Sequence, residues 1–141
     1  MNKKSIFITG AASGIGRETA RLFAGKGWYV GITDMNAKPL KALEDELGEE
    51  NCFARVMDVT DPESYQEAVA DFGETTGGKM DVLFNNAGIL RMGLNEEISL
   101  AEQHLTVDIN IKGILNGIDA ALPLLKKTPG ARIVSMCSTS S

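Results

Sequence analysis

The chain has 141 residues, 43% of them hydrophobic and 23% charged, and its formal net charge is −5 at pH 7. This composition is typical of a globular domain with a core of its own and excludes a disordered chain. Lys and Arg residues are scattered and outnumbered by acids, which argues against a nucleic-acid partner, and no apolar run is long enough to span a membrane.

The first predicted element is a buried strand over residues 5–8, where the sequence SIFI is rich in β-branched and aromatic residues. A glycine turn, TGAASGIG at residues 9–16, follows this strand, and a helix is expected over residues 17–24. An apolar stripe of this helix is predicted from Ile15, Thr19, Leu22 and Phe23, which fall at helical spacing. The glycine turn therefore connects a strand to a helix.

Each glycine of the turn has an expected role. Gly10 can adopt tight-turn backbone angles, Gly14 lets a ligand approach the backbone, and Gly16 lets the helix pack close to the sheet. The new helix would present free N–H groups to a pyrophosphate, with Ser13 and Ile15 beside it. Glycines also punctuate ordinary loops, and this G-x-x-x-G-x-G spacing differs from the common G-x-G-x-x-G fingerprint.

A second strand is predicted at residues 28–33, and Asp34 follows at its carboxyl end. The acid lies about 20 residues beyond the glycine turn, as expected of a carboxylate that binds the adenosine ribose. Such a carboxylate repels a 2′-phosphate by about 4 kcal/mol at 4 Å and an effective dielectric near 20. No Lys or Arg follows at once to receive a phosphate, so we expect NAD as the cofactor and not NADP. The alternative is that Asp34 caps the next helix, although Asn36 is available for that role.

The remaining predicted elements continue the alternation of helices and strands. They are a helix at residues 37–47 capped by Gly48, a strand at 52–57, a helix starting at Asp61-Pro62, a strand at 80–84, a helical region from the Ser99/Glu102 capping box to Leu125 with a break near Thr106, and a strand at 132–136. This alternation predicts an α/β fold, a doubly wound parallel sheet with helices on both faces. We see no internal domain boundary and expect one dinucleotide-binding domain over residues 1–141.

Several polar residues follow predicted strands. Since ligands bind at the carboxyl ends of parallel strands, Gly10, Asp34, Asp58, Asn86 and Ser138 are expected along one edge. For Asp58 the alternative is a turn cap. A metal site is not expected, because no His, Cys and carboxylate spacing suggests one, and the single histidine, His104, is expected at the surface.

The chain resembles the N-terminal part of a short-chain dehydrogenase/reductase. The stretches that carry the resemblance are Thr9–Gly16, Asp34, Asp58-Val59, Asn85-Asn86-Ala87-Gly88, Asn110 and Arg132–Ser138. The resemblance implies a Rossmann-type sheet of five strands in the order 3-2-1-4-5, with the C-terminal part of the fold missing. It also implies hydride transfer between NAD and an alcohol or carbonyl substrate.

The resemblance further implies roles for individual residues. The Asp58 side chain and Val59 backbone would contact adenine, and Asn86, Ala87 and Gly88 would line the nicotinamide-side ribose. Asn110 would hold a proton-relay water, and Ser138 would hydrogen-bond the substrate oxygen. Two alternatives remain: residues 85–88 act largely in the fold, and Asn110 only fixes a helix bend.

Cys137 takes the first place of the family's usual Ser-Ser pair, where a free Cys is expected to behave as a small core residue. Cys52 and Cys137 form no C-x-x-C and are expected as free thiols of a cytoplasmic protein.

The family's proton donor, a Tyr with a Lys four residues later, is not found in this sequence. Tyr29 and Tyr65 are followed four residues later by Thr33 and Val69. The chain is therefore expected to be the cofactor-binding portion of an enzyme, the alternative being a catalytically inactive NAD-binding fragment or truncated product. We expect a homo-oligomer, or else a marginally stable chain, because apolar residues would lie exposed on its long helix: Ile109, Ile111, Ile114, Leu115 and Ile118.

Overall fold

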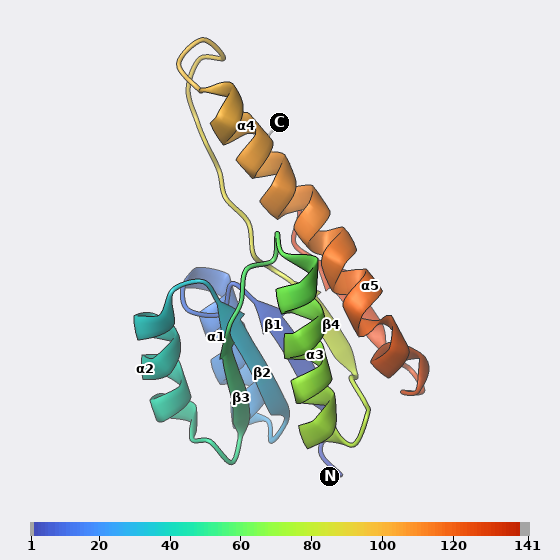
Figure 1. Cartoon of the computed structure of the whole chain (residues 1–141). Helices are drawn as coiled ribbons and strands as arrows, with labels where there is room; N and C mark the ends of the chain where they lie inside the picture. Colours follow the sequence, from blue (N-terminus) through green and yellow to red (C-terminus); the bar gives the residue numbers. More distant parts are fainter. Residues whose placement is uncertain (1, 139–141) are drawn as a thin grey trace.

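Five parallel strands form one sheet in the computed structural model, which describes residues 2–138 (Figure 1). The strands are β1 (Ser5–Thr9), β2 (Tyr29–Asp34), β3 (Cys52–Val56), β4 (Val82–Asn85) and β5 (Arg132–Ser135). Their order is β3-β2-β1-β4-β5, as predicted. The central strand β1 pairs with β2 on one side, Ile6 opposite Val30, and with β4 on the other, Ile6 opposite Val82. The carboxyl ends of β1, β2 and β4 therefore meet at one edge.

Helices cover both faces of the sheet. They are α1 (Gly14–Gly25), α2 (Ala37–Leu47), α3 (Pro62–Thr76), α4 (Leu100–Val107), η1 (Asp108–Lys112) and α5 (Gly113–Lys126). One core cluster lies between the sheet and α3 and α5, and the other lies between the sheet and α1 and α2. Figure 1 shows α4 extending beyond the sheet edge, with the loop that precedes it. The architecture is Rossmann-like.

The cluster under α3 includes a group of packed aromatic rings. Phe7 and Phe72 make an edge-to-face pair with centroids 5.2 Å apart, and both side chains are fully buried. A Cβ on Gly31 of β2 would lie 2.8 Å from the Phe7 ring, so the glycine leaves room for these rings over the sheet. The packing joins the first two strands to α3.

Helix ends follow the predicted capping residues. Asp61 accepts hydrogen bonds from the backbone N–H groups of Glu63 and Ser64 at the start of α3, with Pro62 in the first turn. Ser99 and Glu102 form the predicted capping box of α4. Predicted caps thus set the beginnings of two helices.

The predicted apolar stripe of α1 is wrong at Ile15 and Leu22, whereas Phe23 packs against the core as predicted. Ile15 and Leu22 are 59% and 57% exposed, whereas Gly16 and Ala20 face the sheet. Gly16 packs closely against Gly10 and Asn86, and this contact turns the small residues of α1 toward the sheet. Phe23 packs against the core cluster that lies between the sheet and α1 and α2.

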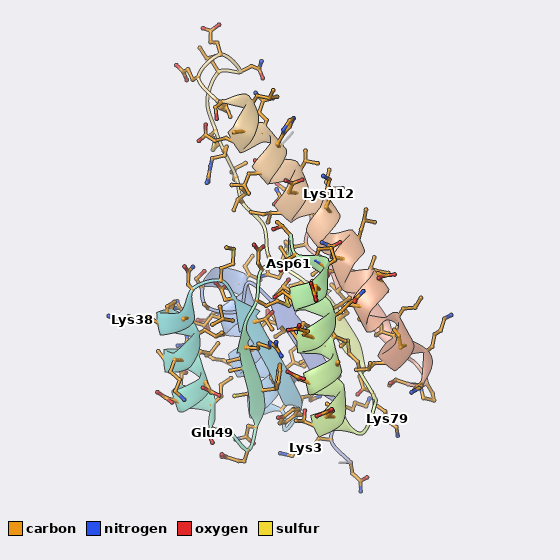
Figure 2. The ribbon with its side chains drawn as sticks, in the orientation of Figure 1. Lys3, Lys38, Glu49, Asp61, Lys79 and Lys112 are labelled. Carbon is orange, nitrogen blue, oxygen red and sulfur yellow. The ribbon has the colours of Figure 1, made fainter. Side chains whose placement is uncertain are left out.

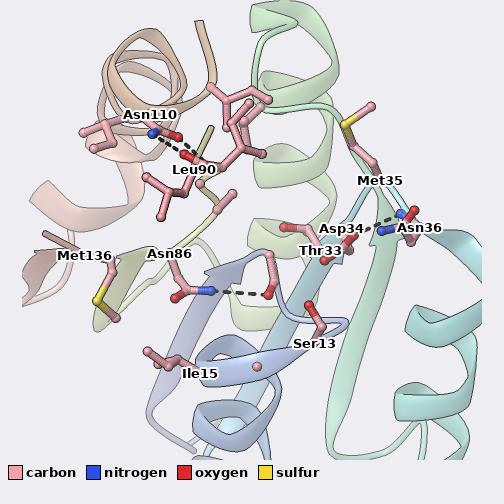
Figure 3. A pocket seen from close by; sticks show the side chains of 18 of the residues that line it. Ser13, Ile15, Thr33, Asp34, Met35, Asn36, Asn86, Leu90, Asn110 and Met136 are labelled. Carbon is pink, nitrogen blue, oxygen red and sulfur yellow. Dashed lines mark hydrogen bonds between the residues drawn. The ribbon is translucent and has the colours of Figure 1, made fainter. Parts of the chain in front are cut away.

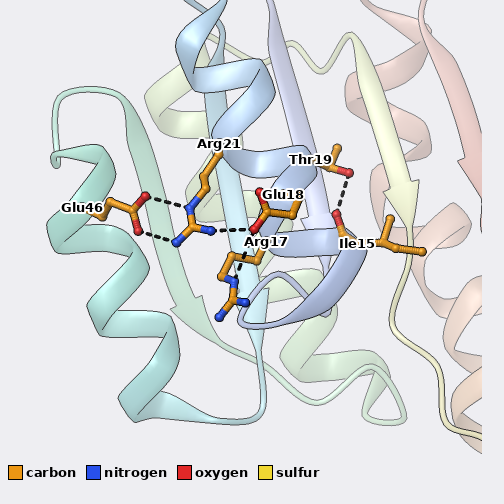
Figure 4. Close-up of polar contacts among 6 residues, drawn as sticks. All are labelled: Ile15, Arg17, Glu18, Thr19, Arg21 and Glu46. Carbon is orange, nitrogen blue, oxygen red and sulfur yellow. Dashed lines mark hydrogen bonds and ion pairs between the residues drawn. The ribbon is translucent and has the colours of Figure 1, made fainter.

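An exposed ion network joins α1 to α2. Arg21 donates through Nε and Nη2 to the Glu46 carboxylate and through Nη1 to Glu18 (Figure 4). The bidentate bond raises the pKa of Arg21 and lowers that of Glu46. Because all three side chains are exposed, the network orients the two helices but adds little stability.

The long helical region has an irregularity, but it is not a break. The helix runs from α4 into α5 through the π-helical η1, which begins two residues after Thr106. Ile111 and Leu115 are exposed, whereas Ile109 and Ile118 pack against the core. Self-association through the exposed residues stays a prediction.

Labelled lysines are dispersed over the surface, as their scattered places in the sequence suggest. Figure 2 shows Lys38, Lys79 and Lys112 on different sides of the molecule, so these cations form no common patch. Among the described helices, none has the length and apolar character that crossing a membrane requires.

Candidate functional site

A cavity of about 720 Å³ opens at the carboxyl ends of the strands (Figure 3). Most of the predicted site residues line it: Gly10, Ser13, Gly14, Ile15, Asp34, Val59, Asn86, Ala87, Gly88, Asn110 and Ser138. Gly16 and Asp58 are not among the lining residues. No group of three or more His, Cys, Asp or Glu residues suited to a metal ion occurs in residues 2–138.

The glycine turn has the expected backbone. Gly10 and Gly14 have φ of +66° and +54°, in the left-handed region that favours glycine. An added Cβ on Gly14 would meet no described atom within 4 Å, so the space beside it is open. On Gly16, by contrast, a Cβ would lie 2.3 Å from the Gly10 carbonyl oxygen and 2.5 Å from Asn86 Nδ2.

The start of α1 is suited to an anion. Ser13 is its N-cap residue, but the Ser13 side chain makes no capping bond to the described backbone, and the first turn contains no acidic residue. The N–H groups of this turn therefore keep donor capacity at the positive end of the helix dipole. A pyrophosphate fits this position by charge and by hydrogen bonding.

Asn86 lies under the glycine turn. Its Nδ2 donates to the carbonyl oxygens of Thr9 at 3.1 Å and Gly10 at 3.3 Å, while the backbone N–H groups of Asn86 and Ala87 donate to Thr9 Oγ1. These bonds fasten the end of β4 to the end of β1. The Asn86 side chain thus has a clear part in the fold, while Ala87 and Gly88 present small surfaces to the cavity.

The Asp34 carboxylate is held in place at the other side of the turn. Its Oδ2 accepts from Ala12 N at 3.1 Å, and its Oδ1 accepts from Asn36 N at 3.0 Å. Asn36, and not Asp34, is the N-cap residue of α2, although its side chain makes no capping bond to the described residues. Each carboxylate oxygen can accept a further bond, so Asp34 keeps capacity for two ribose hydroxyls. None of the described cavity-lining residues is Lys or Arg.

Asp58 and Val59 have different environments. Asp58 Oδ1 accepts from the backbone N–H of Thr60 at 2.9 Å and from Thr60 Oγ1 at 2.7 Å, so the side chain caps a turn. Val59 lines the cavity, and its carbonyl oxygen accepts from Asn116 Nδ2 at 2.9 Å. The adenine contact expected of both residues stays a prediction.

Asn110 lies in the π-helical segment and forms a reciprocal pair with the loop after β4. Its Oδ1 accepts from Ile89 N and its Nδ2 donates to Ile89 O, both at 2.8 Å (Figure 3). π-Helical turns occur often at functional sites. The side chain therefore fixes the helix irregularity to the cavity wall.

The chain leaves β5 through Met136, Cys137 and Ser138, all of which line the cavity. Cys137 is exposed, so the expectation that it behaves as a small core residue is wrong, because it lies beyond the end of β5 at Ser135 and lines the open cavity. Cys52 is the buried thiol, and burial raises its pKa to about 11.

Sequence reasoning missed most of the apolar lining and also two polar residues, Thr33 and Asn36. The missed residues are Thr33, Met35, Asn36, Met57, Ile89, Leu90, Ile109, Ile114, Met136 and Cys137. Met35 lies two residues beyond the predicted strand 28–33 and Met136 is the last residue of the predicted strand 132–136, and a position at the carboxyl end of a strand was a usable signal. Ile109 and Ile114 gave no such signal, since their direction depends on the π-helical turn.

The chain is similar to known proteins in sequence and in fold. The family model described as short chain dehydrogenase matches residues 4–141. Oxidoreductase UcpA of Salmonella typhimurium is 42% identical over 137 residues, which are 96% of this chain and 51% of that protein. The chain thus spans about half the length of the curated relatives it matches.

Two solved structures are similar in fold. A short chain dehydrogenase/reductase from Burkholderia phymatum in complex with NAD has a TM-score of 0.88 and 29% identity, over 96% of this chain and 49% of the other. An alcohol dehydrogenase from the archaeon Thermococcus sibiricus, complexed with 5-hydroxy-NADP, has a TM-score of 0.87 and 30% identity, over 95% and 57%.

Proposed function

The chain belongs to the short-chain dehydrogenase family, and we propose that it is the NAD-binding portion of an oxidoreductase that acts on an alcohol or carbonyl substrate. The observation that carries this proposal is the shared cavity of the glycine turn and Asp34. The glycine turn provides backbone N–H donors for a pyrophosphate, and Asp34 provides a carboxylate for the ribose that two backbone N–H groups hold in position. When bound, the nicotinamide of the cofactor would accept a hydride from an alcohol or, in its reduced form, donate one to a carbonyl.

The cofactor preference follows from Asp34. A 2′-phosphate about 4 Å from this carboxylate would be repelled by about 4 kcal/mol at an effective dielectric near 20. Screening by solvent would reduce this figure, but half of it is still more than a tenfold change in affinity. The lack of Lys and Arg among the described lining residues supports NAD further.

The other residues of the cavity would position the substrate, the cofactor and the loop after β4. Ser138, at the end of β5, would hydrogen-bond the substrate oxygen, and Asn110 would hold the loop that carries Ile89 against the site. Asn86, Ala87 and Gly88 would let the nicotinamide side of the cofactor lie close to the sheet. These roles orient the reacting groups.

A proton donor is not apparent in the described cavity. Tyr29 and Tyr65 are 8% and 0% exposed and pack in the core, away from the lining. We therefore propose turnover for a protein that supplies a donor beyond residues 2–138. The second candidate, an NAD-binding fragment without turnover, is favoured by the same burial of both tyrosines.

Calorimetric titration of the chain with NAD and with NADP tests the proposal. We expect NAD to bind at least about tenfold more tightly. Asp34→Asn should remove most of this preference, because the neutral amide no longer repels a 2′-phosphate. The matched control is Asp45→Asn, an exposed carboxylate on α2 that pairs with Lys41 and does not line the cavity. Equal or tighter binding of NADP to the unaltered chain would refute the preference.

A further inference from the structure

Four side chains that contain sulfur line the cavity. Met35, Met57, Met136 and Cys137 all line it, and they come from the ends of three different strands. In Figure 3, Met35 lies beside Asp34 and Asn36, whereas Met136 lies on the opposite side of the cavity near Asn86. The two methionines thus flank the two ends of the site.

These methionines differ in their access to solvent. Met35 is 59% exposed and Met136 is 41% exposed, but Met57 in the same cavity is only 3% exposed. Met80 is fully buried in the core. Met92 is 84% exposed and lies outside the lining. The chain therefore contains its own controls for both exposure and position.

We propose that Met35 and Met136 are oxidation sites through which a peroxide weakens cofactor binding. This proposal rests on the proposed NAD-binding function. Hydrogen peroxide transfers one oxygen atom to the thioether sulfur, which loses two electrons as the O–O bond breaks and water leaves. The product is a methionine sulfoxide, a polar and chiral side chain that a sulfoxide reductase can return to methionine.

The position of each sulfur explains the effect on the cofactor. Met35 directly follows Asp34, whose carboxylate is fixed by Ala12 N and Asn36 N, so its side chain lies next to the proposed ribose position. Met136 donates its backbone N–H to the Asn85 carbonyl oxygen and precedes Ser138 by two residues, at the proposed nicotinamide end. A thioether offers a flexible apolar contact to a flat ring, and a sulfoxide replaces it with a polar group.

Cofactor binding should in turn protect the two methionines from oxidation. A bound cofactor would cover Met35 and Met136 and slow their oxidation, whereas Met92 would stay open to the solvent. Site-resolved protection by NAD is thus a second readout, independent of the affinity.

The experiment uses the 141-residue chain with Cys137→Ala, which removes the exposed thiol, while the remaining thiol, Cys52, is buried. The chain is treated with hydrogen peroxide with and without saturating NAD, each sulfoxide is located by peptide mass spectrometry, and NAD affinity is measured by calorimetry. We expect oxidation of Met35 and Met136 without NAD, protection of both with NAD, and equal oxidation of Met92 in both. Oxidised chain should bind NAD about tenfold more weakly.

Leucine variants separate the sites, because leucine has a similar volume and no sulfur to oxidise. The double variant Met35→Leu/Met136→Leu should keep its NAD affinity after peroxide, whereas the control Met92→Leu should lose affinity like the parent. If oxidised Met35 and Met136 leave NAD binding unchanged, the inference is wrong and the proposed function stands. If the untreated chain does not bind NAD, both are wrong.

Discussion

Gly16→Ala should destabilise the fold through one backbone clash. The new Cβ would lie 2.3 Å from the Gly10 carbonyl oxygen, and real Cβ atoms essentially never come within 3.0 Å of another heavy atom. Neither neighbour can yield easily, because Gly10 is held in a left-handed turn and Asn86 Nδ2 donates hydrogen bonds to the carbonyl oxygens of Thr9 and Gly10. Overpacking of this kind costs about 1–3 kcal/mol, and a backbone neighbour places Gly16 near the upper end.

Gly25→Ala is the matched control in the same helix. An added Cβ there would meet no described atom within 4 Å, and the backbone is helical. Alanine should therefore be neutral or stabilise α1 by up to about 1 kcal/mol. The two variants make the same chemical change, so their difference reports the contact and not the loss of a glycine.

Urea unfolding followed by far-UV circular dichroism measures both variants. We expect the midpoint of Gly16→Ala to fall with an unchanged slope, and its melting temperature to drop by roughly 5–10 °C. An unfolding free energy for Gly16→Ala within about 0.5 kcal/mol of the parent would refute the reasoning. So would equal destabilisation by Gly25→Ala.

Three further outcomes can be checked on the same chain. Asn110→Ala leaves the Ile89 N–H and carbonyl without their side-chain partners and should cost about 1–3 kcal/mol in urea unfolding, with faster hydrogen exchange at Ile89. Tyr65→Phe should cost less than about 1 kcal/mol by the same assay, because the buried hydroxyl has no hydrogen-bond partner in the described residues. The bonds from Ser99 lower the pKa of Glu102 below its ordinary value of 4.5, so the capping box contributes stability above that pH and loses it as the pH falls through the lowered value. The protection factors of the amides at the start of α4, which are their exchange rates corrected for the intrinsic rate at each pH, should therefore be lower at pH 3 than at pH 7.

The sequence predicts the order of elements well, because strands and helix caps are local signals. Gly48 predicts the end of α2, and Asp61-Pro62 predicts the start of α3, because a glycine cap and a first-turn proline each mark a helix end locally. The polar ends of the strands were also predictable, since parallel strands bring their carboxyl ends to one edge.

The direction of α1 was not predictable from its apolar spacing. Ile15 and Leu22 suggested the buried face, but contact with Gly10 and Asn86 sets the rotation of the helix, and that contact joins residues far apart in the sequence. The place of Ile109 in the cavity lining was not predictable either. A π-helical turn changes which residues face inward, and the sequence has no clear signal for it.

Strand order also has a kinetic consequence. β1 finds its partner β2 nearby in the chain, but its other edge stays unpaired until Val82–Phe84 have been synthesised and have returned to Ile6–Ile8. Long-range parallel pairing of this kind slows folding, because the loop must close before the new contacts form. During that interval the apolar edge of β1 can pair with another chain, so aggregation during folding should be most severe before β4 joins the sheet.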